Sequence, residues 1–232
     1  MPTLSTDGPV WTLDLGDDEN RFTPEFLGEV NALLDQVVDT DEPVALVTTA
    51  TGKFFSNGLA LEWMLANPDG AADYVRDVQD LLARMLTLPV PTAAAVNGHA
   101  FGAGAMLAMA HDHRVMREDR GFFCFPEVDI QIPFSPGMSA LIQAKLTPRA
   151  AVDSMTTGHR FGGTAAAAAG IVDAATPVED LVATAADRIR AFAGKDRGAL
   201  GAIKQTMFAE AVAALHLPHV GPIVGDQTDN AA

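Results

Sequence analysis

The stretch Pro91–Asp112, PTAAAVNGHAFGAGAMLAMAHD, joins a short apolar run to a glycine-rich turn and a second apolar segment. Thr92 to Val96 is predicted to form a buried strand, and Ala105 to Ala110 is small and apolar enough for a buried helix. Between them stand three glycines, Gly98, Gly102 and Gly104. Glycine permits positive φ and close approach of the backbone to a ligand, and the first amides of a helix lack intrahelical acceptors. The turn can therefore hold an anion.

Known phosphate-binding patterns do not fit this turn. A dinucleotide fingerprint needs G-x-G-x-x-G, which the order of these glycines does not match, and no acidic residue follows at the required place. A phosphate-binding P-loop needs G-K-[ST] after its glycines, whereas Ala105 and Met106 follow here. A strand-to-helix packing turn without a ligand stays open, so other stretches must decide.

The composition limits the classes of function. The 232 residues fit one large domain or two small ones, and the net charge of -15 argues against binding to nucleic acid or to anionic membranes. The first residues show no signal-peptide pattern and no apolar run is long enough to span a bilayer, so a cytoplasmic location is expected. The single Cys124 cannot form an internal disulfide and is expected to be a small hydrophobe in a strand.

Strands and helices alternate over the first 125 residues, which predicts an α/β fold with a mostly parallel sheet. The expected strands are Val10–Leu15, Val44–Thr49, Thr92–Val96, His113–Met116 and Gly121–Phe125. The expected helices of this half start at Pro24, with Thr23 as cap, and span Ala71–Leu88. From Ser135 onward the strand signal fades. Helices are predicted from Pro148, after Gly163, over Leu181–Ala193 and over Gly198–Leu215, followed by a frayed tail, Gly221–Ala232.

A second glycine turn follows the strand Val44–Thr49. The stretch TGKFFSNGLALEWM, Thr51–Met64, is predicted to be a loop that runs into a short helix and presents backbone amides at the start of that helix. Two such turns can converge on one oxygen atom. A third informative stretch, Pro126–Ile130, places Glu127 after the last expected strand of the sheet, where ligands of such folds bind.

Three motifs in this order, FFSNGLAL, VNGHAFGAGAMLAMAHD and FPEVDIQIP, resemble the crotonase family, also called the enoyl-CoA hydratase/isomerase superfamily. The resemblance extends from about Val10 to about Asp173. It implies a spiral of ββα turns with a C-terminal helical trimerisation region, and assembly into trimers or hexamers. We accordingly expect a core over residues 1–175 and a helical region over residues 176–232.

The resemblance also implies a ligand and a set of binding residues. Family members bind acyl-CoA thioesters and stabilise an enolate in an oxyanion hole of two backbone amides, which by motif position belong to Leu59 and Ala103. Coenzyme A enters as part of the substrate, and no separate cofactor or metal is expected. The residues expected to contact substrate are Lys53, Phe55, Asn57, Gly58, Ala60, Leu61, Trp63, Gly102, Met106 and Phe134.

The carboxylates distinguish reactions within the family. Hydratases of the family use two glutamates, but the first of these positions is Met106 here and only the second, Glu127, is a glutamate. A single base suits a proton shuttle, the pattern of a Δ3,Δ2-enoyl-CoA isomerase. An apolar wall that includes Met106 is expected to raise the pKa of Glu127. Two alternatives stay open: another crotonase reaction such as hydration or thioester hydrolysis, helped by Glu62 or a water, and an acyl-CoA-binding homologue without useful turnover.

Several neighbouring residues allow an ordinary structural interpretation. His99 is expected to be a packed histidine, Glu62 a solvated helix residue, and the pair His111 and His113 lacks a third metal ligand. Ala60 stands where the family often has aspartate, so Asn57 is expected to cap the short helix instead. An acyl tunnel and plain core are equally open for Trp63, Met64, Phe125 and Phe134.

Overall fold

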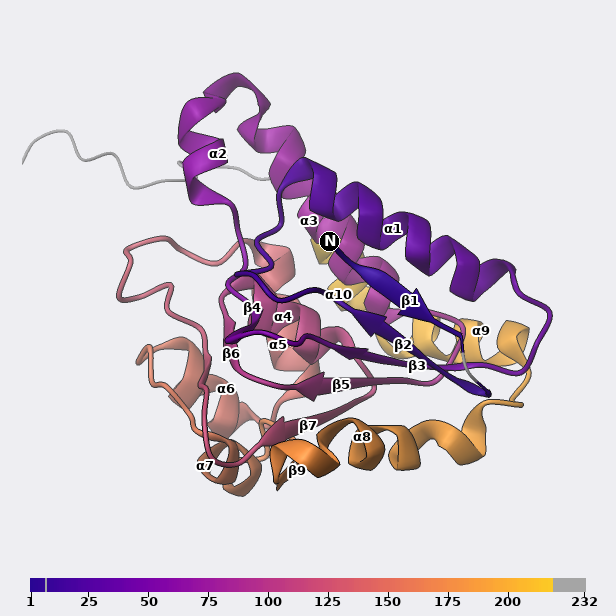
Figure 1. Ribbon diagram of the computed structural model, residues 1–232. Coiled ribbons are helices and arrows are strands. Elements are labelled where there is room, and N and C mark those ends of the chain that lie inside the picture. Colours follow the sequence, from indigo (N-terminus) through magenta and orange to yellow (C-terminus); the bar gives the residue numbers. More distant parts are fainter. Residues whose placement is uncertain (7, 219–232) are drawn as a thin grey trace, which may run out of the picture.

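The computed structural model describes residues 1–6 and 8–218, which form an α/β fold with two sheets (Figure 1). The larger sheet has the strand order β1-β2-β3-β5-β7-β9. Only β1 is antiparallel to its neighbour, and the other four pairings are parallel. Its strands are β1 (Thr3–Ser5), β2 (Val10–Asp14), β3 (Ala45–Thr49), β5 (Thr92–Val96), β7 (His113–Arg117) and β9 (Ala174–Thr176). The predicted mostly parallel sheet is confirmed.

A second, three-stranded parallel sheet is built from the glycine-rich stretches. Its order is β4-β6-β8, with β4 (Phe54–Ser56), β6 (His99–Phe101) and β8 (Phe123–Cys124). The first of these segments was predicted to be a loop and the second a turn, and both predictions are wrong. Each is only three residues long, so its strand conformation depends on pairing with a distant segment rather than on local pattern. Cys124 is buried in β8, as expected.

Helices cover both faces of the larger sheet (Figure 1). One face packs on α8 (Leu181–Ile189) through a small cluster of mostly alanine and valine side chains. The other face packs on α1 (Pro24–Asp39), α3 (Ala71–Leu86) and α4 (Ala103–Ala110) through the main core. The remaining helices are α2 (Leu61–Ala66), α5 (Pro136–Lys145), α6 (Pro148–Met155), α7 (Gly163–Ala168), α9 (Arg197–Met207) and α10 (Ala209–Leu215). Short 3-10 turns are η1 (Pro68–Gly70), η2 (Val178–Asp180) and η3 (Arg190–Phe192).

The start of α1 shows how local sequence sets these elements. Thr23 Oγ1 accepts a hydrogen bond from the Phe26 amide at 3.2 Å, and Pro24 occupies the first helical position, where no amide is needed. Phe22 and Phe26 stack with ring centroids 5.6 Å apart, which holds the entering chain against the core. The Thr23 cap and the helix start at Pro24 that were predicted from the sequence are confirmed.

The second half contains two departures from the predictions. The segment Ala174–Thr176 forms β9 and adds a sixth strand beside β7, although no strand was expected after Ser135. The predicted helix over Gly198–Leu215 is two helices, because α9 ends at Met207 and α10 starts at Ala209. The tail Gly221–Ala232 lies outside the described residues, and the division at residues 175 and 176 stays a prediction.

Candidate active site

The two glycine turns lie directly against each other. Gly58 has φ of 74° and Gly102 has φ of 51°, a region that side chains disfavour. A Cβ on Gly58 would lie 2.7 Å from the Phe101 carbonyl oxygen and 2.9 Å from the Ala103 nitrogen. A Cβ on Gly104 would lie 2.3 Å from the Ser56 carbonyl oxygen. The backbones can therefore approach this closely only because glycine stands at these positions.

This contact brings two amides without acceptors close together. Ala103 is the first residue of α4, so its amide has no intrahelical partner. Within residues 1–6 and 8–218, neither the Leu59 amide nor the Ala103 amide donates a hydrogen bond. A buried amide normally finds a partner. The arrangement therefore leaves donors for an oxygen atom of a ligand.

The amides on both sides of Leu59 are held by buried hydroxyl groups. Gly58 N donates to Ser56 Oγ at 3.1 Å, and Ala60 N donates to the Tyr74 hydroxyl at 2.8 Å. Burial raises the pKa of Tyr74 to about 12, so the phenol stays protonated at neutral pH. Tyr74 projects from α3 and packs against Trp63. These contacts fix the turn while leaving the Leu59 amide open.

Glu127 lies beside the second turn. The parallel pairing of β6 and β8 includes a hydrogen bond from Gly102 N to Cys124 O at 3.0 Å, which brings the following Pro126 and Glu127 next to Gly102. A Cβ on Gly102 would lie 3.6 Å from Glu127 Oε1. Glu127 is 8% exposed, and its Oε2 atom is buried without a hydrogen-bond partner among the described residues.

Burial governs the ionisation of this carboxyl group. Loss of solvent raises the pKa of Glu127 from 4.5 to about 7, while a hydrogen bond from its own backbone opposes the shift. No charged side chain from the described part of the chain contributes to the shift. A carboxylate with a pKa near neutrality is a stronger base than an ordinary one and can both take and return a proton at pH 7.

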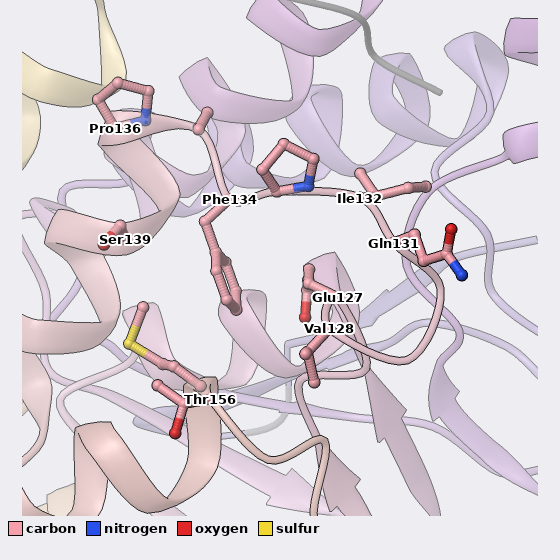
Figure 2. A pocket seen from close by; sticks show the side chains of 11 residues that line it. Glu127, Val128, Gln131, Ile132, Phe134, Pro136, Ser139 and Thr156 are labelled. Atoms are coloured by element: carbon pink, nitrogen blue, oxygen red, sulfur yellow. The ribbon is translucent and has the colours of Figure 1, made fainter. Parts of the chain in front are cut away.

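A cavity of about 760 Å³ opens in front of Glu127 (Figure 2). Figure 2 shows the carboxyl group and the Phe134 ring on neighbouring walls. The walls also come from the loop after Glu127, from α5 and from the end of α6. The lining residues are Glu127, Val128, Gln131, Ile132, Pro133, Phe134, Ser135, Pro136, Ser139, Met155 and Thr156. Most of this surface is apolar, as expected for a site that receives a hydrocarbon chain.

Of the expected substrate-binding side chains, only Phe134 lines this cavity together with Glu127. Phe134 packs edge-on against Phe125, which is fully buried core. Met106 is buried in α4, one turn after the Gly102 backbone, and its amide donates to Gly102 O at 3.0 Å. Phe55 is fully buried in β4.

The remaining expected contact residues do not line the described cavity. Lys53 is exposed at the start of β4, with its ammonium group 5.2 Å from the Phe54 ring. Asn57 donates to Glu19, and α2 starts at Leu61 with Ala60 as an N-cap that has no side-chain bond. The prediction that Asn57 caps α2 is therefore wrong. The Ala60 amide is instead bound by Tyr74, a residue from a distant helix.

His99 and His111 are held by packing or hydrogen bonds, and Glu62 is exposed to solvent. His99 packs among the rings of Phe54, Phe101 and Phe122. His111 is fully buried, with its ring nitrogens 2.8 Å from Leu107 O and from Thr48 Oγ1, and burial lowers its pKa to about 4. Glu62 is exposed on α2. No cluster of potential metal ligands occurs within the described residues.

Sequence reasoning missed several cavity residues. Gln131 has φ of 58°, a conformation that no sequence pattern predicts. It lies where the chain turns from Glu127 toward Phe134. Met155 and Thr156 come from the end of α6, far along the chain, and carry no motif. Only the tertiary packing of α6 beside the loop brings them to the site.

Two facing glycine turns with open amides and a buried carboxyl group are features of an enzyme site. The profile of the enoyl-CoA hydratase/isomerase family matches residues 10–218, and the chain is a member of this family, which has the crotonase fold. It is an enzyme of the crotonase superfamily.

Similar proteins agree with this assignment. The chain is 41% identical over 182 residues to enoyl-CoA delta isomerase 3 of Arabidopsis thaliana, covering 75% of this chain and 76% of that protein. It is 40% identical over 184 residues to the peroxisomal enoyl-CoA delta isomerase 2 of the same plant, covering 75% and 77%. The structure of human mitochondrial delta3-delta2-enoyl-CoA isomerase shares the fold, with a TM-score of 0.85 at 24% identity, covering 92% of this chain and 85% of that one.

Proposed function

We propose that the protein moves the double bond of a 3-enoyl-CoA to the 2-position by a single-base proton shuttle. The observation that carries the proposal is the buried Glu127 carboxyl group, whose Oε2 has no partner in the described structure and whose pKa is about 7, placed beside the Gly102 turn. Support also comes from the two plant isomerases, which are about 40% identical to this chain.

In the proposed reaction the thioester oxygen binds to the amides of Leu59 and Ala103. Glu127 removes a proton from C2, and negative charge moves to the thioester oxygen as a dienolate forms. The protonated Glu127 then returns the proton to C4, so the double bond between C3 and C4 becomes one between C2 and C3. Two oriented amides stabilise the developing charge by several kcal/mol, on the order of 3 kcal/mol for each donor.

The position of Met106 argues for isomerisation over hydration. Met106 is 1% exposed and apolar, so it cannot activate water, and Glu62 is exposed on α2 and does not line the cavity. One carboxyl group then serves both proton transfers. In this proposal water is an unwanted competitor, and the apolar walls around Phe134 exclude it.

The binding of the remaining substrate follows from the family motifs. We propose that the acyl chain passes Phe134 in the described cavity and that Lys53 approaches the phosphates of the coenzyme A portion. Coenzyme A is part of the substrate and not a separate cofactor. The other contacts proposed are those of Phe55, Asn57, Gly58, Ala60, Leu61, Trp63, Gly102 and Met106.

The oligomeric state and the cellular location of the protein do not follow from the active site. We propose a homotrimer or hexamer, which light scattering can measure. Within residues 1–6 and 8–218, none of the helices combines the length and apolar character that crossing a bilayer requires. A cytoplasmic location stays a prediction, because one plant relative is described as peroxisomal.

The test is turnover of a 3-enoyl-CoA to the conjugated 2-enoyl-CoA, followed by ultraviolet absorbance. The wild type should convert the substrate, and Glu127→Gln should be at least about a hundredfold slower, because the amide cannot take the proton. Hydration of a 2-enoyl-CoA, assayed in parallel, should be much slower than isomerisation. Fast hydration, or full isomerase activity in Glu127→Gln, would overturn the single-base proposal. Tight acyl-CoA binding without either reaction would favour a binding role instead.

A further inference from the structure

In the described structure, the backbone of Gly58, Leu59 and Ala60 has one polar group without a partner, the Leu59 amide. The Gly58 amide is bound by a buried hydroxyl group, and Gly58 O accepts from Phe22 N at 2.9 Å. Ala60 O accepts from Met64 N at 3.1 Å, as part of the start of α2. The turn is therefore held on both sides of its open amide.

The peptide group between Leu59 and Ala60 is held at both ends by side chains from distant parts of the chain. Its oxygen accepts from Arg21 Nη1 at 3.1 Å, and its amide donates to the Tyr74 hydroxyl at 2.8 Å. A peptide group is planar, so a hydrogen bond at each end leaves it little freedom to rotate. Because the preceding peptide group is held through Gly58 O, the direction of the Leu59 N–H bond is fixed as well.

The two side chains that hold this peptide group differ in burial. Tyr74 is 2% exposed in the first turn of α3, and its ring packs against Trp63 with centroids 5.1 Å apart. The Arg21 side chain is 38% exposed and pairs with Glu19, with Nε and Oε2 2.5 Å apart. A buried amide that loses its partner costs more free energy than a weakened contact at the surface. Tyr74 is therefore expected to matter more than Arg21.

A phenol suits this position because it accepts a hydrogen bond without bringing a charge. Burial raises the pKa of Tyr74 to about 12, so the group stays neutral over the working range of pH. Residue 60 is alanine, whose side chain makes no hydrogen bond at the start of α2. The hydroxyl group from α3 thus holds an end of the turn that the turn's own side chain cannot hold.

We propose that Tyr74 is a positioning residue: it binds the Ala60 amide so that the Leu59 amide points at the thioester oxygen of the substrate. Arg21 supports the same peptide group from its carbonyl end. The inference rests on the proposed function in one respect, the use of the Leu59 amide as an oxyanion donor. Tyr74 acts through the backbone and neither touches the substrate nor transfers a proton.

Infrared difference spectra of bound hexanoyl-CoA, isotope-labelled at the thioester carbonyl, test the direction of the amide. Hydrogen bonds to the carbonyl oxygen lower its stretching frequency, so the wild type should move this band below its position in solution. Tyr74→Phe removes only the hydroxyl group. This variant should lose about half of the shift or more, because one of the two donors is displaced.

Kinetics and a matched ligand extend the test. Tyr74→Phe should lower kcat for a 3-enoyl-CoA about tenfold, and Arg21→Gln, at the more exposed contact, about threefold. The apparent pKa of about 7 in the pH profile should not change in Tyr74→Phe, because that ionisation belongs to Glu127. The affinity for S-hexyl-CoA, a thioether that has no carbonyl oxygen, should stay within about twofold of the wild type.

Thr48→Val is the matched control for the loss of a buried hydroxyl group. Thr48 is fully buried in β3, and its Oγ1 lies 2.8 Å from Nε2 of His111, the residue that ends α4. The control should lower the thermal unfolding midpoint about as much as Tyr74→Phe does. It should leave the carbonyl band and kcat unchanged, whereas a merely structural role of Tyr74 predicts the same result for both variants.

The possible failures can be told apart. If the wild type does not isomerise but Tyr74→Phe still moves the carbonyl band, the proposed function fails and the positioning role stands. If the wild type isomerises and Tyr74→Phe keeps its band and its kcat, the positioning role is overturned and the proposed function stands. A band that the wild type does not shift overturns the positioning role whatever the activity. Equal losses in Thr48→Val, or a displaced pH profile in Tyr74→Phe, also overturn it.

Discussion

At the start of β5 and β7, Asp112 accepts hydrogen bonds from Thr92 N and Lys204 Nζ, whereas after β8 one carboxylate oxygen of Glu127 has no partner in the described structure. The contrast extends to neighbouring groups. Near Asp112, the buried Arg114 donates to three carbonyl oxygens, those of Met109, His111 and Ile171. Near Glu127, the amides of Leu59 and Ala103 donate to no described acceptor.

The comparison distinguishes polar groups that hold the fold together from polar groups that can still bind a ligand. A buried charge is costly unless it is paired and hydrogen-bonded, so the saturated cluster at Asp112 holds strands and helices together. Glu127 carries the cost of burial without such compensation, which appears as its raised pKa. We infer that Glu127 is kept open for substrate.

The largest effect is expected when a side chain is placed between the two glycine turns. Gly58→Ala would place a Cβ 2.7 Å from Phe101 O and 2.9 Å from Ala103 N at a positive φ. The turns must then separate, so isomerase kcat/KM should fall by about a hundredfold or more. Gly28→Ala, where a Cβ meets no atom of residues 1–6 and 8–218 within 4 Å, is the matched control and should keep full activity. Normal kinetics in Gly58→Ala would show that the contact between the turns is dispensable.

Breaking the saturated cluster should reduce stability. Lys204 is 3% exposed, and Lys204→Met leaves the Asp112 carboxylate without its cationic partner. The free energy of unfolding should drop by about 3 kcal/mol, measured by urea denaturation at pH 7. Arg149→Met, which removes one partner of the exposed pair Arg149 and Asp153, should leave the unfolding midpoint unchanged. Equal effects of the two variants would contradict the view that burial makes the first pair important.

Replacing Glu127 by an uncharged residue should raise the free energy of unfolding, whereas Lys204→Met should lower it. Its pKa is raised from 4.5 to about 7 in the folded protein, so stability falls as pH rises through this interval and the native carboxyl group ionises. Glu127→Gln should therefore be more stable than the wild type by about 1 to 3 kcal/mol at pH 8, with the difference falling to about a quarter of this at pH 5. Thermal unfolding at both pH values measures this. A Gln variant that is less stable at pH 8 would mean that the carboxylate is compensated in the native state.

Local sequence predicted the elements whose signals are local. The Thr23 cap and Pro24 predicted the start of α1, and the helix predicted over Ala71–Leu88 is α3, which ends at Leu86. The strands β4, β6 and β9 were missed, because three-residue strands acquire their conformation from distant partners. The break between α9 and α10 at Phe208 likewise carries no glycine or proline signal.

The candidate site shows the same division. The motifs predicted both glycine turns and Glu127, because each of these features depends on a short continuous stretch of sequence. They could not predict that Tyr74 of α3 binds the Ala60 amide, or that Met155 reaches the cavity from α6.

The pH dependence of isomerisation tests most directly whether the open carboxyl group is the base. Wild-type kcat/KM for a 3-enoyl-CoA, measured from pH 5 to pH 9, should rise about tenfold per pH unit at low pH and level off above an apparent pKa of about 7. The rise reflects ionisation of Glu127, and the residual activity of Glu127→Gln should lack it. A profile that is level down to pH 5, or one unchanged in Glu127→Gln, would contradict the assignment of Glu127 as the base.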